Sequence, residues 1–242
     1  MATNTLTQNI NQAINDFKGV RQALMDKGVE IPSGTPTSQY GAKIGEISGG
    51  GEQPTKGYQV TEWDSNGFPL KVKLYGMTEI PDYYFYCSSN GGGFTKLYAI
   101  DDLSNITTIG KYAFNRCTSL TLTSLPDGLT TINNGAFNGC TSLALTSLPD
   151  GITSIGSYAF YECTQLALTS LPEGVTSIGQ WAFLRCYSLT TLTIGSAIKS
   201  IATDAFDDCT NLKTIIINRA EGTVSGAPWG ATNATVQWIG TN

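Results

Sequence analysis

Histidine is absent from all 242 residues of the chain, and charged residues make up only 14% of it. Without imidazole there is no Ser-His-Asp or Cys-His nucleophile pair, no histidine general base and no histidine-ligated zinc. Lysine and arginine number 14 against 19 acidic residues, a net charge of −5 with no basic patch. A nucleic-acid partner needs such a patch. We therefore expect a protein that is neither an enzyme nor a nucleic-acid binder.

Long apolar runs are also missing. No run approaches the length of about 18 residues that a membrane helix needs, so we expect no membrane insertion. The N-terminus has no basic segment followed by an apolar one, so we expect no signal peptide. Hydrophobic residues still amount to 40%. A polar surface made of Thr, Ser, Asn and Gly is typical of extracellular β-rich proteins and repeat stacks, and not of disordered chains.

A repeat of 23 residues dominates what is present. The motif Ala-Phe-x-x-Cys occurs five times, with an Ile eight residues before each Cys and a Leu three residues after it. The Phe positions are Phe114, Phe137, Phe160, Phe183 and Phe206, and the Cys positions are Cys117, Cys140, Cys163, Cys186 and Cys209. Residues 80–85 (IPDYYF) resemble a degenerate first unit, followed by an insertion at 89–93. A 23-residue unit cannot bury its own apolar face, so the units must stack on one another.

We interpret each unit as a short strand, a turn, a second extended piece and a compact helical turn that carries Ala-Phe. The turn is Pro-Asp-Gly or Pro-Glu-Gly, in which Pro fixes φ and Gly permits a positive φ. The first three units read Leu-x-Leu-x-x-Leu, as in Leu166, Leu168 and Leu171, whereas the last two read Leu-x-x-Leu-x-Leu or Ile, as in Leu189, Leu192 and Ile194. This difference predicts a change of strand register or a bulge between the two sets.

The pattern Ile-x-x-x-Ala-Phe-x-x-Cys-x-x-Leu resembles the BspA-type (Treponema pallidum-type) leucine-rich repeat over roughly residues 76–218. The resemblance implies a surface or secreted adhesin that binds host proteins, other bacteria or glycans, and it implies that the motif residues form the core. The predicted fold class is α+β: a leucine-rich-repeat solenoid of about five to six 23-residue units over 77–218, preceded by an N-terminal helical module and a β-hairpin cap.

The flanks complete the predicted domains. Residues 1–48 are expected to form a helical attachment or oligomerisation module, because apolar residues from Leu6 to Leu24 follow heptad spacing. That module is either a helical hairpin closed on itself or a short bundle that makes a homo-oligomer. Residues 49–57 are expected to be a flexible linker, 58–76 a β-hairpin N-cap around residues 64–67 (DSNG), and 219–242 a C-terminal cap with Trp229 and Trp238 covering the core.

A second resemblance concerns short segments. Residues 23–32 (ALMDKGVEIP) with 40–45 (YGAKIG) are similar to N-terminal modules of tail-fibre and tail-associated proteins from phages and prophages of gut Firmicutes. The stretch 226–231 (GAPWGA) resembles the ending of repeat proteins from the same setting. The resemblance implies a virion-associated location reached by cell lysis, which needs no signal peptide. The predicted localisation is therefore virion-associated or extracellular at a cell surface.

The recurring Cys could form disulfides, a metal site or buried free thiols. The repeated Cys should lie on neighbouring rungs ~4.8 Å apart. Parallel Cβ vectors would leave the Cβ atoms beyond the ~3.8 Å that disulfides prefer. Buried free thiols are therefore favoured over disulfides or a metal site.

Asp127, Asp150 and Glu173 also repeat at 23 residues. They are interpreted as turn residues, with a calcium ladder or an acid–base pair as the alternatives. No cofactor and no metal are predicted.

The candidate binding residues lie at positions that vary between units. Tyr112, Tyr158 and Trp181 precede Ala-Phe in three units, where the other two have Gly135 and Asp204. Thr123, Thr146 and Thr169 are expected on the strand face that points away from the core. Aromatic residues are efficient anchors in interfaces, although edge packing between units would explain them equally.

These observations favour a non-enzymatic recognition protein, a phage or prophage tail-associated component that contacts a cell-surface protein or glycan. The alternatives are a BspA-like bacterial surface adhesin and a purely structural spacer.

Overall fold

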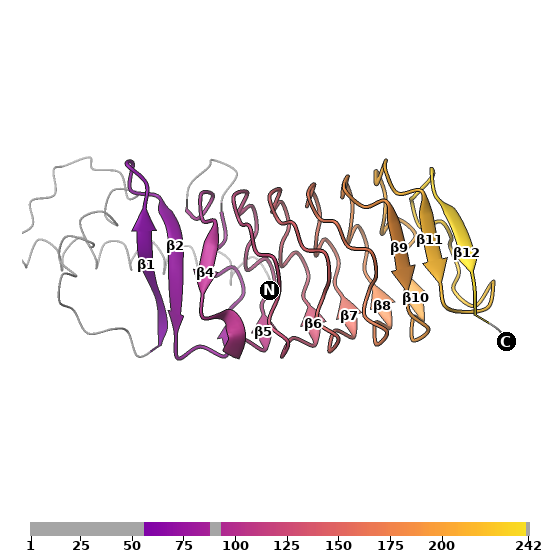
Figure 1. Cartoon of the computed structure of the whole chain (residues 1–242), viewed down its shortest axis with the longest axis horizontal. Helices are drawn as coiled ribbons and strands as arrows, with labels where there is room; N and C mark the ends of the chain where they lie inside the picture. The colour runs from indigo at the N-terminus through magenta and orange to yellow at the C-terminus, as the bar shows by residue number, and fades with distance from the viewer. Residues whose placement is uncertain (1–55, 88–92, 241–242) are drawn as a thin grey trace, which may run out of the picture.

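The structure is a computed structural model that describes residues 56–87 and 93–240. These residues form one elongated stack of rungs, with β1 near one end and β12 at the other (Figure 1). Each rung has three sides. The front side follows the Leu after each Cys. The base side carries the repeated Ile, and the turn side carries Ala-Phe.

The front side begins with β1 (Gly57–Trp63) and β2 (Pro69–Tyr75), which pair antiparallel, and β2 pairs in parallel with β4 (Ala99–Asp101). The β1–β2 turn is closed by Asp64, whose carboxylate accepts the backbone N–H groups of Asn66 and Phe68 at 2.8 and 2.9 Å. At the other end, β9 (Thr191–Ile194), β11 (Thr214–Ile217) and β12 (Thr235–Trp238) form a parallel sheet. The front side between β4 and β9 has no strand.

The base side holds a run of two-residue strands, each ending in the repeated Ile. They are β3 (Glu79–Ile80), β5 (Thr108–Ile109), β6 (Thr131–Ile132), β7 (Ser154–Ile155), β8 (Ser177–Ile178) and β10 (Ser200–Ile201). β3 pairs with β5, and β6, β7, β8 and β10 pair in that order, all in parallel. In every one the Ile is buried and the preceding residue is not, as strand alternation requires.

The turn side is not helical, contrary to the expectation of a helical turn. An α-helix needs N–H groups bonded to carbonyls four residues back. Here alternate N–H groups leave the rung: those of Tyr112, Phe114 and Arg116 donate to Asn134, Ala136 and Asn138 of the next rung at 2.9, 2.9 and 2.6 Å. Tyr112 and Arg116 have φ of 53° and 59°, which a right-handed helix excludes.

The core is a stack of identical side chains. Phe85, Phe114, Phe137, Phe160, Phe183 and Phe206 are fully buried, and successive ring centroids lie 5.2–5.7 Å apart with planes within 15° of parallel. The rung spacing therefore holds each ring against the next, an arrangement in which aromatic pairs add to simple area burial.

All six cysteines are buried free thiols, as predicted for the five that repeat. The thiols of Cys140, Cys163 and Cys186 each donate to the carbonyl of the Phe in the preceding rung, at 3.1 Å. Cys87, which lies outside the Ala-Phe-x-x-Cys spacing, still joins this row, with its sulfur 3.9 Å from that of Cys117.

Threonine hydroxyls link the rungs on the surface. Thr118, Thr141 and Thr164 each donate to a carbonyl 23 residues earlier, at 3.1–3.2 Å, and Thr153 and Thr176 do the same at another corner. The high Thr content of a chain with few charges is thus explained in part by hydrogen bonds between rungs.

At the C-terminal end Trp229 is fully buried, and its ring lies 6.2 Å from that of Trp238. Trp238 and Val236 are only half-buried in β12, whereas the equivalent Ile217 and Ile215 of β11 are fully buried. The last rung is therefore less covered than the one before it.

The predicted α+β class is wrong. The residues that the structure describes form a β-solenoid of about five 23-residue turns; they include one 3-10 turn, η2 (Leu103–Asn105), and no α-helix. The helical module predicted for residues 1–48, together with its oligomerisation, lies outside the described residues, and the structure gives it no support. Nor does any helix within the described ranges have the length and hydrophobicity to cross a bilayer.

Candidate functional site

An aromatic row runs along the turn side at the position that precedes Ala-Phe. Tyr83, Tyr112, Tyr158 and Trp181 occupy it, and we call these four residues the aromatic stripe. The rings of Tyr83 and Tyr112 stack with centroids 5.5 Å apart and planes 10° apart, and those of Tyr158 and Trp181 lie 5.1 Å apart at 52°. The structure thus aligns the three predicted aromatic residues in one row and adds Tyr83, which the degenerate first unit concealed.

Gly135 interrupts the row without leaving a gap. A Cβ at Gly135 would lie 2.2 Å from Cε1 of Tyr112, so the Tyr112 ring covers the glycine backbone. Burial, then the proximity of the Tyr83 and Tyr158 hydroxyls, raises the pKa of Tyr112 above its usual value. The stripe is therefore nearly continuous from Tyr83 to Trp181. The Tyr112 ring lies between the Tyr83 ring and the Gly135 backbone.

The stripe residues share an unusual backbone. Tyr83, Tyr112, Tyr158 and Trp181 have φ between 52° and 60°, a region that bulky residues rarely adopt. Backbone hydrogen bonds between rungs compensate for the cost of the positive φ, since the N–H groups of Tyr112 and Tyr158 donate to the next rung at 2.9 Å. Large side chains are therefore held at strained positions where glycine also fits, as Gly135 shows with a φ of 62°.

Charged side chains lie beside the stripe at its C-terminal half. Arg185 donates to Glu162 at 2.8 Å and to Asp208 at 3.4 Å, across three successive rungs. Burial and the neighbouring Glu162 carboxylate raise the pKa of Tyr161. All three charged residues are substantially exposed, so this ion group shapes the surface more than it stabilises the fold.

Thr123, Thr146 and Thr169 are exposed on the front side, as expected, but they belong to no strand. The structure does not bring them together with Tyr112, Tyr158 or Trp181, which lie on the turn side. Thr123 lines a hollow on the front side.

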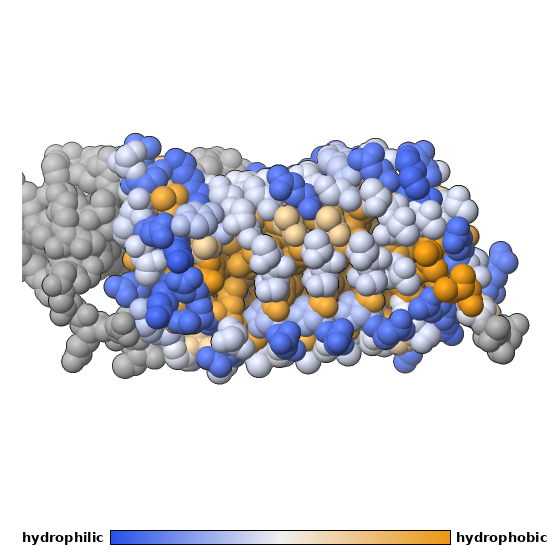
Figure 2. All heavy atoms as spheres, in the orientation of Figure 1, coloured by the Kyte–Doolittle hydropathy of each residue, from blue (hydrophilic) through white to orange (hydrophobic). Residues whose placement is uncertain are grey.

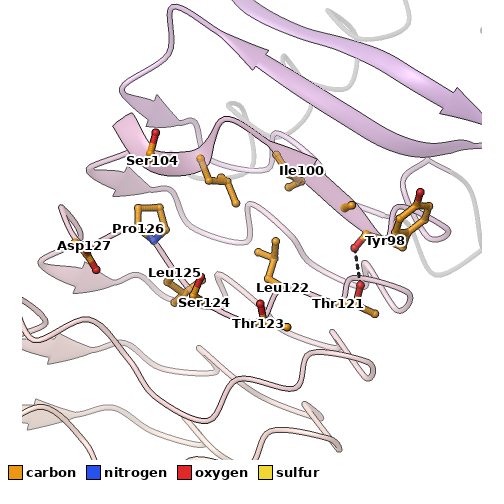
Figure 3. A pocket seen from close by; sticks show the side chains of 12 residues that line it. Tyr98, Ile100, Ser104, Thr121, Leu122, Thr123, Ser124, Leu125, Pro126 and Asp127 are labelled. Carbon is orange, nitrogen blue, oxygen red and sulfur yellow. Dashed lines mark hydrogen bonds between the residues drawn. The ribbon is translucent and has the colours of Figure 1, made fainter.

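That hollow, which we call the front groove, lies between β4 with η2 and the segment 121–127 (Figure 3). Its volume is about 480 Å³, and it is lined by Tyr98, Ala99, Ile100, Leu103, Ser104 and all residues from Thr121 to Asp127. The two rungs are joined at one end, where Thr121 donates to the Tyr98 carbonyl through its N–H at 3.0 Å and its hydroxyl at 2.9 Å. Figure 3 shows Ser104 and Asp127 at the opposite end.

The front groove arises from a change in the phase of the apolar pattern. Leu97 and Ile100 point inward at a spacing of three, and the next rung has Leu120 and Leu122 at a spacing of two. Thr123, which is aligned with the buried Ile100, is exposed. Because a shift of one residue turns a strand's faces over, the two rungs cannot continue a common ladder. Sequence inspection found the equivalent change between 166–171 and 189–194 but missed this one.

Figure 2 shows apolar atoms visible between rows of weakly polar side chains on this side of the molecule. The groove lining includes Ile100, Leu103, Leu122 and Leu125 as apolar members and Asp127 as the sole charged one. Within residues 56–87 and 93–240 no three His, Cys, Asp or Glu side chains are grouped to hold a metal.

The repeated acidic turn residues have separate roles. Glu173 accepts the backbone N–H of Ser196 at 3.1 Å and the side-chain amide of Asn218 at 3.3 Å, and it thereby holds the following turns. Asp127 and Asp150 are exposed. The turn interpretation accounts for Glu173 without a cation.

The model of the BspA type leucine rich repeat region matches residues 78–213 in six copies, more than half of the chain. No curated protein matches. Among solved structures, a leucine rich repeat protein of T. pallidum is 24% identical with a TM-score of 0.49, covering 78% of this chain and 82% of that one.

Two further solved structures are similar. A leucine-rich repeat protein from Bacteroides ovatus is 21% identical with a TM-score of 0.37, covering 67% of this chain and 52% of that chain. A leucine rich cell surface protein from Faecalibacterium prausnitzii is 16% identical with a TM-score of 0.26, covering 78% of this chain and 94% of that one.

Proposed function

Because the chain belongs to the BspA-type leucine-rich repeat family, which fits a protein-binding or adhesion role, we propose that it is a non-enzymatic recognition protein whose aromatic stripe contacts a partner on a bacterial surface. The stripe carries the proposal. Its rings are aligned over several rungs, only partly buried, and placed at positions that the repeat does not need for its core. Tyrosine and tryptophan at such positions are the residues that most often dominate binding energy.

The finer proposal is a phage or prophage tail-associated, receptor-binding component. It is supported by the resemblance of residues 23–32 and 40–45 to N-terminal modules of tail-fibre proteins, and of 226–231 to the ending of repeat proteins from the same setting. The partner would be a cell-surface protein or glycan, and the location virion-associated. The family itself supports the second candidate, a BspA-like adhesin on the surface of a bacterium. An antibody against the chain separates the two, since it labels virions in one case and bacterial walls in the other.

Binding to whole cells tests the recognition role. Fluorescently labelled protein is titrated onto a panel of gut Firmicutes strains, and the variant Tyr158→Ala/Trp181→Ala is compared with the parent. We expect binding to at least one strain, and at least a tenfold loss in the variant, since a truncated hot spot costs about 2 kcal/mol or more. Tyr187→Ala is the matched control, because Tyr187 is an exposed aromatic residue outside the stripe.

Two results contradict the proposal. If the stripe variant binds as the parent does, the stripe is packing between rungs and not a contact surface. If the parent binds no strain, the protein behaves as a spacer. Circular dichroism of both variants establishes first that they keep the β-solenoid.

A further inference from the structure

The front groove combines the edge of β4 with backbone N–H groups that have no backbone partner among the described residues. Within that part of the chain, the N–H groups of Leu122, Thr123, Ser124 and Leu125 make no backbone hydrogen bond. Residues 144–148 of the next rung also lack such hydrogen bonds there, so the edge of β4 and the hollow beside it distinguish the groove. β4 is the last strand of its sheet, so beyond the Tyr98–Thr121 contact no ladder joins it to the next rung. A strand edge of this kind is a template for another extended chain.

At the second change of phase, between 166–171 and 189–194, the two rungs are joined by backbone hydrogen bonds. There Thr193 of β9 donates its N–H to Thr169 at 2.9 Å and accepts the N–H of Leu171 at 2.8 Å, and Ser170 forms an isolated parallel bridge with Thr193. An extended segment thus closes the second boundary. The corresponding segment at the first boundary, residues 122–125, stands away from β4 and leaves the hollow of about 480 Å³.

The side chains that line the front groove determine which kind of ligand fits it. Ile100, Leu103, Leu122 and Leu125 offer apolar contact, and Thr121, Thr123 and Ser124 form a polar rim. The sole charge in the lining is that of Asp127, at the end opposite the Tyr98–Thr121 contact (Figure 3). No lysine or arginine lines the groove to neutralise it.

We propose that the front groove is a binding site for an extended polypeptide strand that pairs with the backbone of residues 122–125, places aliphatic side chains against Leu103 and Leu122, and carries a basic residue toward Asp127. The main-chain hydrogen bonds supply affinity, and the side-chain positions supply selectivity, as in other cases of strand addition. This site is separate from the aromatic stripe, so it does not depend on the proposed cell-surface contact.

The direction of the strand follows from the neighbours. All front-side pairs after β2 are parallel, so an added strand in the same sense runs from the Tyr98–Thr121 end toward Asp127. The basic residue then lies at the carboxyl end of the strand. A suitable probe is the capped peptide acetyl-Thr-Val-Thr-Val-Lys-amide, and its matched control has Glu in place of Lys.

The test is titration of the isotopically labelled full chain with these peptides, followed by NMR of the backbone amides. We expect the Lys peptide to shift the amides of residues 99–101 and 122–125 at millimolar concentration. The Glu peptide should bind about threefold more weakly, and Asp127→Asn should remove that preference. A peptide with N-methylated alternate amides should not bind.

A two-residue exchange provides the structural control. In Leu122→Thr/Thr123→Leu, the segment 120–125 reads Leu-Thr-Thr-Leu-Ser-Leu and acquires the phase of 189–194 (LTTLTI). Since 189–194 contains β9, this variant should pair with β4, close the groove and lose peptide binding while keeping its composition. Its circular dichroism and melting temperature show whether it folds, and Asp127→Asn serves as the test if it does not.

Three outcomes overturn the proposal. The first is the absence of amide shifts with the Lys peptide, and the second is shifts confined to other sides of the rungs. The third is equal binding of the N-methylated peptide, which would make the groove an apolar pocket for side chains or small molecules. Loss of cell binding in the stripe variant with peptide binding intact separates this site from the proposed function.

Discussion

Phe137 lies between Phe114 and Phe160 in the core, with ring centroids 5.4 and 5.7 Å away, and it is fully buried. Phe137→Ala removes both ring contacts and leaves a cavity in a stack that cannot close over it. We expect a loss of about 3–5 kcal/mol in the free energy of unfolding, measured by urea denaturation. Thr146→Ala, on the exposed front side, should change it by no more than about 0.5 kcal/mol. A small effect of Phe137→Ala would mean that the rungs do not depend on the ring stack.

The core thiols make stability depend on alkaline pH. Burial raises the pKa of Cys117, Cys140, Cys163, Cys186 and Cys209 above the ordinary value of 9.0, in the case of Cys209 to about 12. A raised native pKa means that the native state holds protons that the unfolded chain releases. The stabilising contribution is therefore complete below pH 9 and is lost as the pH rises toward 12.

Urea denaturation at a series of pH values measures this dependence. We expect a flat free energy of unfolding between pH 7 and 8 and a fall from about pH 9 upward. Cys163→Ala should reduce the slope of that fall. A free energy that is constant to pH 11 would contradict the account of the thiols.

Gly135 connects a backbone requirement to the stripe. Its φ is 62°, and an added Cβ would strike the Tyr112 ring. Gly135→Ala should lower the free energy of unfolding by about 1–2 kcal/mol from the backbone alone, and by more while Tyr112 is present. Adding Tyr112→Ala to the Gly135→Ala variant should recover only the loss of stability that the contact with the Tyr112 ring causes. Additivity of the two substitutions in thermal unfolding would show that the ring does not cover the glycine.

At the scale of elements, the period of 23 made the core predictable, because a residue repeated at one position must meet its own copies when units stack. Phe114, Cys140 and Ile155 were identified in this way. The turn side was not predictable by the same reasoning. Ala-Phe-x-x-Cys has a helical spacing, and spacing does not reveal that alternate N–H groups donate to the next rung.

Other elements were missed because a degenerate copy hides its own register. Cys87 lies one residue from the expected position, yet its sulfur reaches Cys117. Tyr83 became recognisable as part of the stripe through its contact with Tyr112. The front groove was missed because the rung of Leu97 and Ile100 was not aligned with the rung of Leu120 and Leu122. The binding role of Tyr112, Tyr158, Trp181, Thr123, Thr146 and Thr169 stays a prediction.

The molecule as a whole behaves as a one-dimensional array, in which each rung contacts only its neighbours. Deleting residues 141–163 removes one complete period and joins two rungs of the same phase. We expect a native-like far-ultraviolet spectrum and a calorimetric unfolding enthalpy lower by about 16 kcal/mol, from the usual enthalpy per residue.

Deletion of residues 141–160 is the matched control, because it removes nearly as many residues but breaks the period. It should lose cooperative unfolding. If both deletions behave alike, the rungs are not interchangeable units, and the stack is held by something other than the repeat.

The same array explains why function must be sought in departures from the repeat. The positions that recur carry core side chains, and the two surfaces of interest lie where the pattern changes. The aromatic stripe is at a position that holds aromatic residues, Gly or Asp. The front groove is at a change of phase. At the front groove the backbone N–H groups of residues 122–125 have no backbone partner among the described residues, although β4 lies in the adjacent rung.

Amide hydrogen exchange of the unmodified protein, followed by NMR, measures whether these N–H groups are hydrogen-bonded. We expect fast exchange at Leu122–Leu125, whose N–H groups make no backbone bond to any described residue, and slow exchange at Thr193, whose N–H donates to Thr169 at 2.9 Å. Equal protection of residues 122–125 and Thr193 would contradict this expectation, because the N–H groups of 122–125 would then be hydrogen-bonded and the groove closed.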